Sequence, residues 1–302
     1  MGRTNISWAD KVWNPITGCT KVSEGCRHCY AERMARRLRG RYGYPSDQPF
    51  RPTFHPDRLS EPLRWKKPRV IFVCSMADPF HSSIVPETIC QVLAVIALCA
   101  RHRFVILTKR PERMRRCLES IDRDPAAILS GAAMEAFGKE AAAQVANAIT
   151  GDPAAEQRVG WPMRNLCVGI SAEDQNAADL RALDLIFTPA AFRCASLEPL
   201  LAPINLAGWL EAGTMCVNCG DLSGFGTCCG EQHRVSIPGL DWIIVGGESG
   251  PGARPMKAEW AGKLRDQCAL AGVSFFYKQR SGPVPGLEPV LDGTAWKEMP
   301  TW

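Results

Sequence analysis

Short apolar runs rich in β-branched residues recur along the chain, and helix-like segments separate them. After a first strand near residues 13–17, these runs occupy residues 69–75, 103–109, 165–171, 192–198, 241–247 and 273–279. Near-continuous apolar strands that alternate with helices are typical of a parallel sheet buried on both faces. The pattern therefore predicts an α/β fold, organised as a complete or partial parallel (β/α) barrel.

Two insertions interrupt this alternation. Residues 122–161 are rich in alanine and predict a helical insertion, whereas residues 215–239 hold a group of cysteines. A chain of 302 residues is long enough for one α/β barrel or for two ordinary domains. We expect a single domain over residues 1–302, with both insertions inside it.

Polar residues follow the predicted strands at the point where each strand ends. Because the carboxyl ends of parallel strands meet at one edge of a sheet, ligands bind there in α/β folds. The polar residues at these ends are Ser75 with Asp78, Lys109 with Arg110, Ser171 with Glu173, Glu198, Glu248 and Lys278. We expect these side chains to converge on one ligand site.

The composition is that of a soluble globular protein, with 46% hydrophobic and 22% charged residues. The longest apolar run, residues 89–100, is too short to cross a bilayer and predicts a buried helix. The N-terminal residues lack the apolar stretch of a secretory signal. We therefore expect a protein of the reducing cytoplasm that has no membrane partner.

The net charge of +5 is small but unevenly distributed. Residues 27–69 are dense in arginine, interleaved with tyrosine, phenylalanine and tryptophan. That mixture suits contact with a phosphate backbone and exposed bases. A solvated basic face beside a proline-rich loop is the alternative, and basic runs on ordinary surfaces are common.

Two groups stand out among the 14 cysteines. In a reducing compartment, clustered cysteines more often bind metal or act in catalysis than form disulfides. The first group, Cys19, Cys26 and Cys29, has one thiolate fewer than an iron–sulfur cluster or a structural zinc normally takes. A [4Fe–4S] cluster on these cysteines would leave one iron open to a cofactor or substrate. Zinc, with His28 or another residue as a fourth ligand, is the alternative.

The segment "CRHCY" resembles the cluster loop of radical S-adenosylmethionine (SAM) enzymes. Over nearly its whole length, the chain resembles the phage Gp37/Gp68-like family of radical SAM proteins. This resemblance includes "ISWADKVWNPITGCTKVSEGCRHCYAE", "SMADPFH", "LTKRPERM", "GISAEDQ", "SLEPLLAPI", "DWIIVGGESGPGARPM" and "FFYKQ". Six residues separate Cys19 from Cys26, where the superfamily more commonly has three, but the wide spacing matches this family.

The resemblance implies a radical SAM barrel with a [4Fe–4S] cluster on Cys19, Cys26 and Cys29. It also implies S-adenosylmethionine as cofactor, contacted by Tyr30, Ser75, Asp78, Lys109, Ser171, Glu173 and Glu198. Substrate contacts are expected from Arg110, Glu248, Arg254 and Lys278. Asp78 could instead cap the following helix, and the glutamates could pair with neighbouring arginines.

The second group of cysteines lies in the insertion at residues 215–239. Cys216 and Cys219 form a C-x2-C pair between glycines and are followed by Cys228, Cys229 and His233. This spacing predicts a closed Zn²⁺ site, and either both adjacent cysteines bind or one binds with His233. A second iron–sulfur cluster is the alternative.

Together these features predict an enzyme that generates a 5′-deoxyadenosyl radical and acts on a nucleic-acid base or a group attached to one. The resemblance implies an isomerase step in thymidine hypermodification of phage DNA, in the host cytoplasm. Its partners would be DNA or a modified nucleotide and a reductant such as flavodoxin or ferredoxin. A DNA photoproduct lyase and a non-catalytic nucleic-acid-binding accessory protein are the alternatives.

Overall fold

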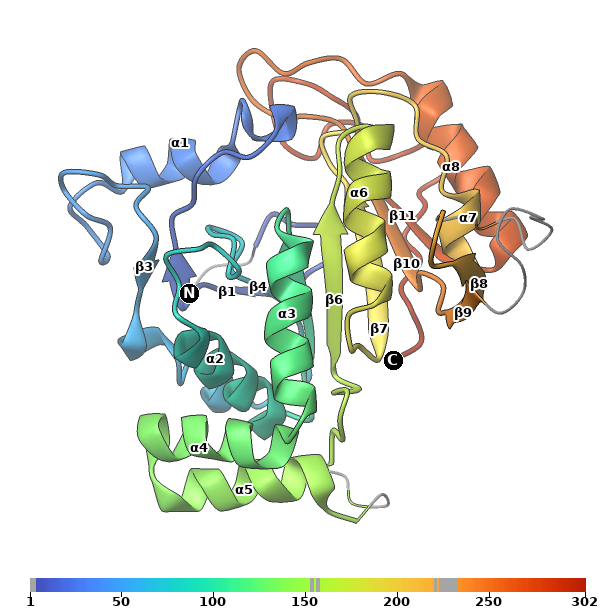
Figure 1. The fold of residues 1–302 in the computed structure, drawn as a ribbon. Helices are drawn as coiled ribbons and strands as arrows, with labels where there is room; N and C mark the ends of the chain where they lie inside the picture. The colour runs from blue at the N-terminus through green and yellow to red at the C-terminus, as the bar shows by residue number, and fades with distance from the viewer. Residues whose placement is uncertain (1–3, 153–154, 156–157, 220–221, 223–232) are drawn as a thin grey trace. The chain divides into compact units, whose positions relative to one another are not determined.

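The computed structural model describes residues 4–152, 155, 158–219, 222 and 233–302. The chain divides into two compact units. The first comprises Met1–Ile170, Thr188–Phe192 and Trp302, and the second comprises Ser171–Phe187 and Arg193–Thr301. Figure 1 shows the elements of both units. Among the described residues, no helix is both long and apolar enough to cross a membrane.

The apolar runs form the main sheet, as predicted. Its strands are β1 (Lys11–Trp13), β4 (Val70–Val73), β5 (Arg103–Thr108), β6 (Leu166–Ser171), β7 (Phe192–Leu197), β10 (Trp242–Gly246) and β11 (Ser274–Gln279). The strand order is β1-β4-β5-β6-β7-β10-β11, so strands that follow one another along the chain are neighbours. The α/β fold and the seven-stranded parallel sheet are therefore confirmed, and because β1 and β11 do not pair among the described residues, the sheet is a partial (β/α) barrel rather than a complete one.

The first strand differs from the prediction, because residues 13–17 are divided between two sheets. Strand β1 ends at Trp13, opposite Val73, whereas β2 (Ile16–Thr17) pairs antiparallel with β3 (Thr53–Phe54). Pro15 lies between them and cannot donate a ladder hydrogen bond. Beside it, the Asn14 side chain accepts from the Met76 backbone N–H at 3.1 Å. The chain therefore leaves the main sheet just before the first cysteine group.

Helices of the first unit begin mostly at prolines, which suit the first helical turn. The α-helices are α1 (Tyr30–Arg37), α2 (Pro86–Leu98), α3 (Pro111–Asp122), α4 (Pro125–Phe137) and α5 (Lys139–Thr150), and the short 3-10 helices are η1 (Glu24–Cys26), η2 (Pro56–Arg58) and η3 (Pro62–Arg64). Helix α2 is buried along most of its length, as its apolar run predicted. The alanine-rich insertion contains α4 and α5, which pack on each other and against α2 (Figure 1).

The core of the first unit lies around strands β1, β4 and β5. Trp13 has no exposed surface and meets the Phe104 ring edge-on, with ring centroids 6.1 Å apart. Ile71 and Ile106 are buried beside them. Burial of such side chains contributes about 1.5–3 kcal/mol each, so this sheet is a rigid base for the loops at its carboxyl edge.

The second unit contains α6 (Gln175–Ile186), α7 (Ala207–Leu210) and α8 (Ala258–Ala271). Strand β10 is buried at every residue, including Trp242. A separate antiparallel hairpin is formed by β8 (Gly213–Cys216) and β9 (Arg234–Ile237). The cysteine-containing insertion at residues 215–239 therefore begins in β8 and ends just after β9.

Candidate functional site

The loop that carries the first cysteine group begins after β2 with a glycine, and the backbone conformation there requires this residue type. Gly18 has φ +87°, and a Cβ there would lie 2.2 Å from the Arg51 carbonyl oxygen. The next residue, Cys19, donates its backbone N–H to the Phe50 carbonyl at 3.0 Å. Only glycine permits this close approach, so Gly18 fixes the position of the backbone that carries Cys19.

Cys19, Cys26 and Cys29 are half-buried free thiols on the loop between β2 and α1. Cys26 ends η1, and Cys29 immediately precedes α1. Other cysteines differ in kind: burial raises the pKa of both Cys74 and Cys268 to about 12. Those two behave as small core hydrophobes, whereas the loop thiols combine partial exposure with close sequence spacing.

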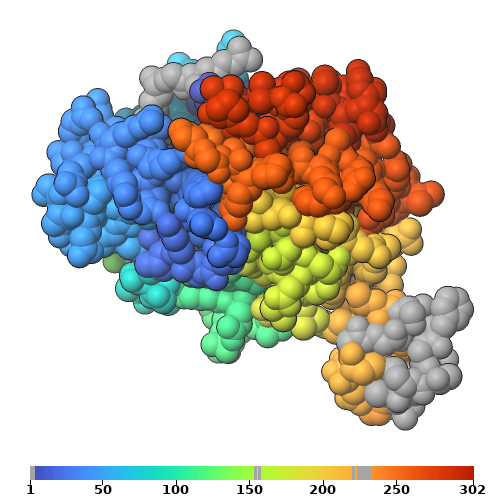
Figure 2. Space-filling model, turned by 90° about the horizontal axis from the view of Figure 1, so that it is seen from above, coloured from blue at the N-terminus to red at the C-terminus, as the bar shows by residue number. Residues whose placement is uncertain are grey.

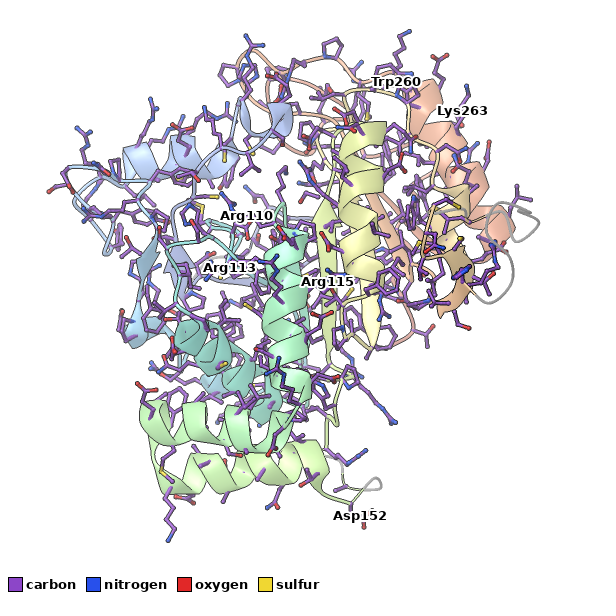
Figure 3. The ribbon with its side chains drawn as sticks, in the orientation of Figure 1. Arg110, Arg113, Arg115, Asp152, Trp260 and Lys263 are labelled. Atoms are coloured by element: carbon purple, nitrogen blue, oxygen red, sulfur yellow. The ribbon has the colours of Figure 1, made fainter. Side chains whose placement is uncertain are left out.

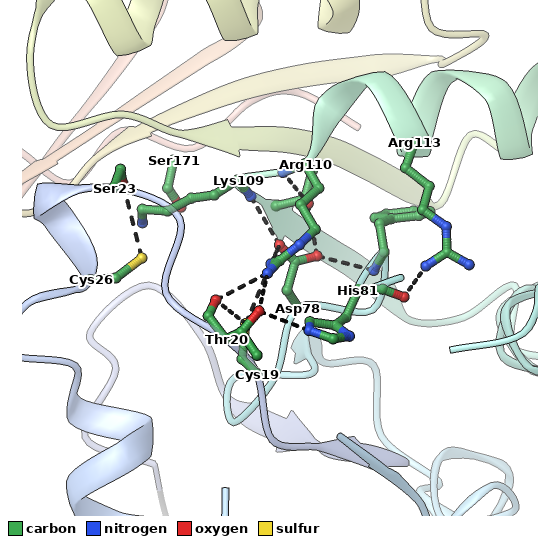
Figure 4. Close-up of polar contacts among 12 residues, drawn as sticks. Cys19, Thr20, Ser23, Cys26, Asp78, His81, Lys109, Arg110, Arg113 and Ser171 are labelled. Carbon is green, nitrogen blue, oxygen red and sulfur yellow. Dashed lines mark hydrogen bonds and ion pairs between the residues drawn. The ribbon is translucent and has the colours of Figure 1, made fainter. Parts of the chain in front are cut away.

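Arg110 connects this loop to the carboxyl ends of the strands (Figure 4). It lies between β5 and α3, and Figure 3 shows it with Arg113 at the start of α3. Its Nη1 donates to Asp78 Oδ2 at 2.9 Å and to Cys19 Sγ at 3.3 Å. Its Nη2 donates to the Thr20 carbonyl and Thr20 Oγ1, both at 3.0 Å. One guanidinium therefore holds two successive residues of the loop.

Asp78 is the buried anchor of Arg110, with 6% of its surface exposed. Its Oδ1 accepts from Thr108 Oγ1 at 2.8 Å and from the Phe80 N–H at 3.0 Å. Its Oδ2 accepts from the Lys109 N–H at 3.2 Å as well as from Arg110. The alternative that Asp78 caps a helix is wrong, because the next helix, α2, has Val85 at its N-cap.

The charged groups around Cys19 shift the pKa of its thiol in opposite directions. Burial raises the pKa of its thiol and the Asp78 carboxylate adds to the rise, while the Arg110 guanidinium lowers it. For Arg110, burial alone would lower the pKa, but Asp78 and Cys19 raise it overall. Arg110 is therefore a permanent cation that donates a hydrogen bond to a cysteine sulfur, an interaction that favours the thiolate.

His81 holds the same loop from the β4 side. Its Nδ1 accepts from the Ser83 N–H at 3.1 Å, which assigns the ring proton to Nε2, 2.9 Å from Thr20 Oγ1. Burial lowers the pKa of His81, followed by Arg110 and Arg113, so the ring is neutral at pH 7. Arg113 donates to the carbonyls of His81 and Ile84 and fixes this segment (Figure 4).

The sequence analysis missed Thr20, His81 and Arg113 as site residues. His81 ends the segment "SMADPFH", and Arg113 follows Arg110 by three residues. The only signal in the sequence was that these residues follow the ends of predicted strands. Their contacts connect residues that are far apart along the chain. Thr20 and His81, for example, are 61 residues apart.

Three predicted cofactor residues of the first unit lie around this network. Ser75 donates its hydroxyl to Asn14 Oδ1 at 3.2 Å. Lys109 gives only its backbone N–H to Asp78, and in Figure 4 its side chain points toward the segment that contains Ser23 and Cys26. Tyr30 is 51% exposed at the start of α1. The structure therefore leaves the Tyr30 ring accessible beside the cysteine loop.

The predicted residues of the second unit lie in ion pairs. Glu173 is 1% exposed and accepts from Arg181 Nη1 at 2.9 Å, while Arg181 also donates to the Ser171 carbonyl. Glu198 accepts from Lys278. Glu248 and Arg254 form the remaining pair, with Nη2 and Oε1 2.6 Å apart. The expected pairing of a glutamate with a neighbouring arginine is thus confirmed for Glu173.

The family model described as "Protein of unknown function (DUF5131)" matches residues 3–300. The chain belongs to the DUF5131 family. No curated protein and no solved structure matches it.

The second cysteine group of this DUF5131 protein is described only in part. Cys216 is buried at the end of β8 and Cys219 is exposed beyond it. The Val217 N–H donates to the His233 carbonyl at 2.8 Å, so His233 lies opposite this turn. Cys228 and Cys229 lie outside the described residues.

Metal-binding geometry is not preformed in the part of the chain that the structure describes. Within it, no three or more His, Cys, Asp or Glu side chains are gathered as ligands of one ion. The chemistry of the first loop nevertheless fits a thiolate-bound group, since its three thiols are free and partly exposed. Because metal binding is coupled to folding, the metal itself commonly brings ligands of this kind into their final geometry.

Proposed function

We propose that this DUF5131 protein is a radical SAM enzyme, and that Cys19, Cys26 and Cys29 hold its [4Fe–4S] cluster. The observation that supports this most directly is the loop itself: three free, half-buried thiols between β2 and α1, with Arg110 donating to Cys19 Sγ. A set of three thiolates leaves one iron of the cluster open for S-adenosylmethionine. When bound, the cluster supplies the electron that cleaves this cofactor and starts radical chemistry.

The residues around the loop have separate tasks in this proposal. Arg110 positions Cys19 and Thr20, and Asp78 holds Arg110 in place. Tyr30, exposed next to Cys29, offers a ring on which the cofactor adenine can stack. Further contacts with the cofactor from Ser75, Lys109, Ser171, Glu173 and Glu198 follow from the family resemblance and remain predictions.

For the substrate we propose a nucleic-acid base or a group attached to one. The arginine-rich segment supports this choice, because α1 and the segment that follows it lie on the face that Figure 2 shows, in blue. Tyr42, in the same segment, is 75% exposed. An isomerase step in thymidine hypermodification is the reaction we favour, with a flavodoxin or ferredoxin as reductant, and a photoproduct lyase would use the same machinery.

The second cysteine group is proposed to bind Zn²⁺ through Cys216, Cys219, Cys228 and Cys229, with His233 as an alternative ligand. The position of Cys216 and Cys219 at the turn of the β8–β9 hairpin, opposite His233, supports a small metal-stapled insertion. Such a site would stabilise the insertion rather than perform chemistry, because a closed tetrahedral zinc has no free coordination position.

The test is reductive cleavage of S-adenosylmethionine by anaerobically reconstituted protein. Cys26→Ala should abolish formation of 5′-deoxyadenosine, whereas Cys90→Ala should retain it. Cys90 is a suitable control because it is also free and half-buried but lies in α2. Equal cleavage by wild-type protein and Cys26→Ala would overturn the cluster assignment. If neither protein cleaved the cofactor, the non-catalytic accessory protein would be the better explanation.

A further inference from the structure

A groove lies beside Cys19 in the first unit, on the side of the loop that faces α1. Its volume is about 750 Å³, within the size range of ligand sites. It is lined by Cys19, Thr20, Lys21, Glu32, Arg36, Arg39, Gln48, Pro49, Phe50, Arg51 and Pro52. The lining thus combines one residue of the proposed cluster loop with residues from the arginine-rich segment.

The side chains that line this groove carry an excess of positive charge. Four basic side chains line it against one carboxylate, that of Glu32. Glu32 is shared by two of them, since it lies 3.2 Å from Lys21 Nζ and 2.6 Å from Arg36 Nη2. Burial alone would raise the pKa of Glu32, but the hydrogen bonds from Arg36 and Lys21 lower it overall. The carboxylate is therefore ionised and still leaves one of these two cations uncompensated.

Of the other two cations, Arg51 is partly compensated by an aspartate outside the groove lining, and Arg39 adds to the excess. Arg51 pairs with Asp47 at 3.2 Å across two half-exposed side chains, a pair that an incoming anion can displace at little cost. Arg39 interacts electrostatically with the same Asp47 carboxylate, but no hydrogen bond or ion pair among the described residues involves its guanidinium. The groove therefore offers guanidinium groups whose hydrogen-bonding capacity is not used within the protein, and guanidinium is the side chain best matched to phosphate.

One wall of the groove is apolar. Phe50 is half-buried between the buried Pro49 and the half-buried Pro52, and it packs against the cluster of Ala31, Ala35, Tyr44 and Met76. This wall is rigid because the Phe50 carbonyl accepts the Cys19 N–H. Basic side chains that follow a backbone, together with an aromatic surface, are the features by which proteins hold single-stranded nucleic acid.

We propose that this groove binds the phosphodiester backbone of single-stranded DNA and leads one nucleotide to the cysteine loop. The identification of that nucleotide as substrate rests on the proposed function. Phosphate binding does not, because the groove consists of side chains that need no cluster. Cys19 lies in the lining, so a strand in the groove passes directly beside the first proposed cluster ligand.

Metal-free protein is used for the test, with a fluorescein-labelled oligothymidylate as probe and fluorescence anisotropy measured over a range of salt concentrations. The variant Arg36→Gln, Arg39→Gln, Arg51→Gln should bind at least about tenfold more weakly at low salt. Because each lost contact with a single strand lowers the slope of log K against log salt by about 0.7, the slope should fall by about 2. A duplex of the same length should bind more weakly than the single strand.

The matched control is Arg116→Gln. Arg116 pairs with Glu112 four residues earlier at 2.6 Å and is 72% exposed, as Arg36 pairs with Glu32 at 2.6 Å and is 71% exposed. Arg116 lies on α3, outside the groove. This control should keep the affinity and the slope of the wild-type protein, whereas Arg36→Gln alone should lower both.

The outcomes separate the groove from the cluster. A triple variant that loses oligothymidylate binding but still takes up iron supports the groove, since only the groove has changed. Wild-type affinity and slope in the triple variant would overturn the proposal, as would tighter binding of the duplex. Wild-type protein that binds the oligonucleotide through these arginines yet retains no iron would support the groove and contradict the proposed function alone.

Discussion

The pair of Asp78 and Arg110 gives the sharpest test of how the cysteine loop is held. Their side chains are 8% and 15% exposed, and their charged atoms lie 2.9 Å apart. Removing one partner of a buried pair costs about 3–5 kcal/mol, because the other charge stays buried without compensation. Arg110→Gln should therefore lower the free energy of unfolding by about 3 kcal/mol.

Asp78→Asn should lower the free energy of unfolding somewhat more than Arg110→Gln does. Asp78 Oδ2 accepts from both the Lys109 N–H and Arg110, and an amide NH₂ in that place would face two donors. An unsatisfied buried donor adds about 1–3 kcal/mol, so we expect a total loss of about 4 kcal/mol. Because the two single changes break the same interaction, the double variant should show a coupling energy of about 2–3 kcal/mol.

The assay is urea unfolding followed by tryptophan fluorescence, with Arg116 and Glu112 as the reference cycle. That pair is closer, at 2.6 Å, but its side chains are 72% and 62% exposed. Exposed pairs on a helix contribute only about 0.3–0.5 kcal/mol. If the cycle of Asp78 and Arg110 gave a coupling as small as this reference, burial would not be what makes the network strong, and our reasoning would fail.

Three further predictions concern other parts of the molecule. Gly18→Ala should lower the free energy of unfolding by several kcal/mol and reduce iron uptake, because a Cβ would meet the Arg51 carbonyl at φ +87°; unchanged urea unfolding and iron content would contradict this. Burial, then Arg58, lowers the pKa of His55 to about 4, and its Nε2 lies 2.7 Å from Thr17 Oγ1. The unfolded chain therefore binds more protons between pH 6.5 and 4, and the free energy of unfolding should fall by up to about 3 kcal/mol as pH drops through this window. The His55→Gln variant should lose this dependence, and an unaltered pH profile would refute the assignment. For the hairpin, Cys216→Ser should reduce zinc from about one per chain to near zero by elemental analysis, whereas Cys268→Ser should not; zinc retained by Cys216→Ser would exclude it as a ligand.

Much of the fold could be predicted from the sequence, because buried parallel strands have nearly continuous apolar sequences. The runs at residues 103–109 and 192–198 coincide with β5 and β7 to within a residue. The division at Pro15 was missed, since apolar residues continue on both sides of it. Only the pairing partners, Val73 for Trp13 and Phe54 for Ile16, reveal two sheets.

The sequence predicted which cysteines belong to the site, but not which side chains hold their loop in place. The spacing of Cys19, Cys26 and Cys29 singled out the loop, because clustered thiols are rare without a function. The sequence did not indicate that Arg110 holds Asp78, 32 residues away, and Cys19, 91 residues away. Such contacts depend on the register of β4 and β5, which no local pattern encodes.

The central claim is that the three-cysteine loop holds an iron–sulfur cluster with one open iron. The most direct measurement is the iron, sulfide and zinc content of anaerobically reconstituted protein, together with the electron paramagnetic resonance spectrum after reduction. We predict about four irons per chain and a reduced-cluster signal that changes when S-adenosylmethionine is added. Zinc alone, with no iron retained, would contradict the claim and assign both cysteine groups a structural role.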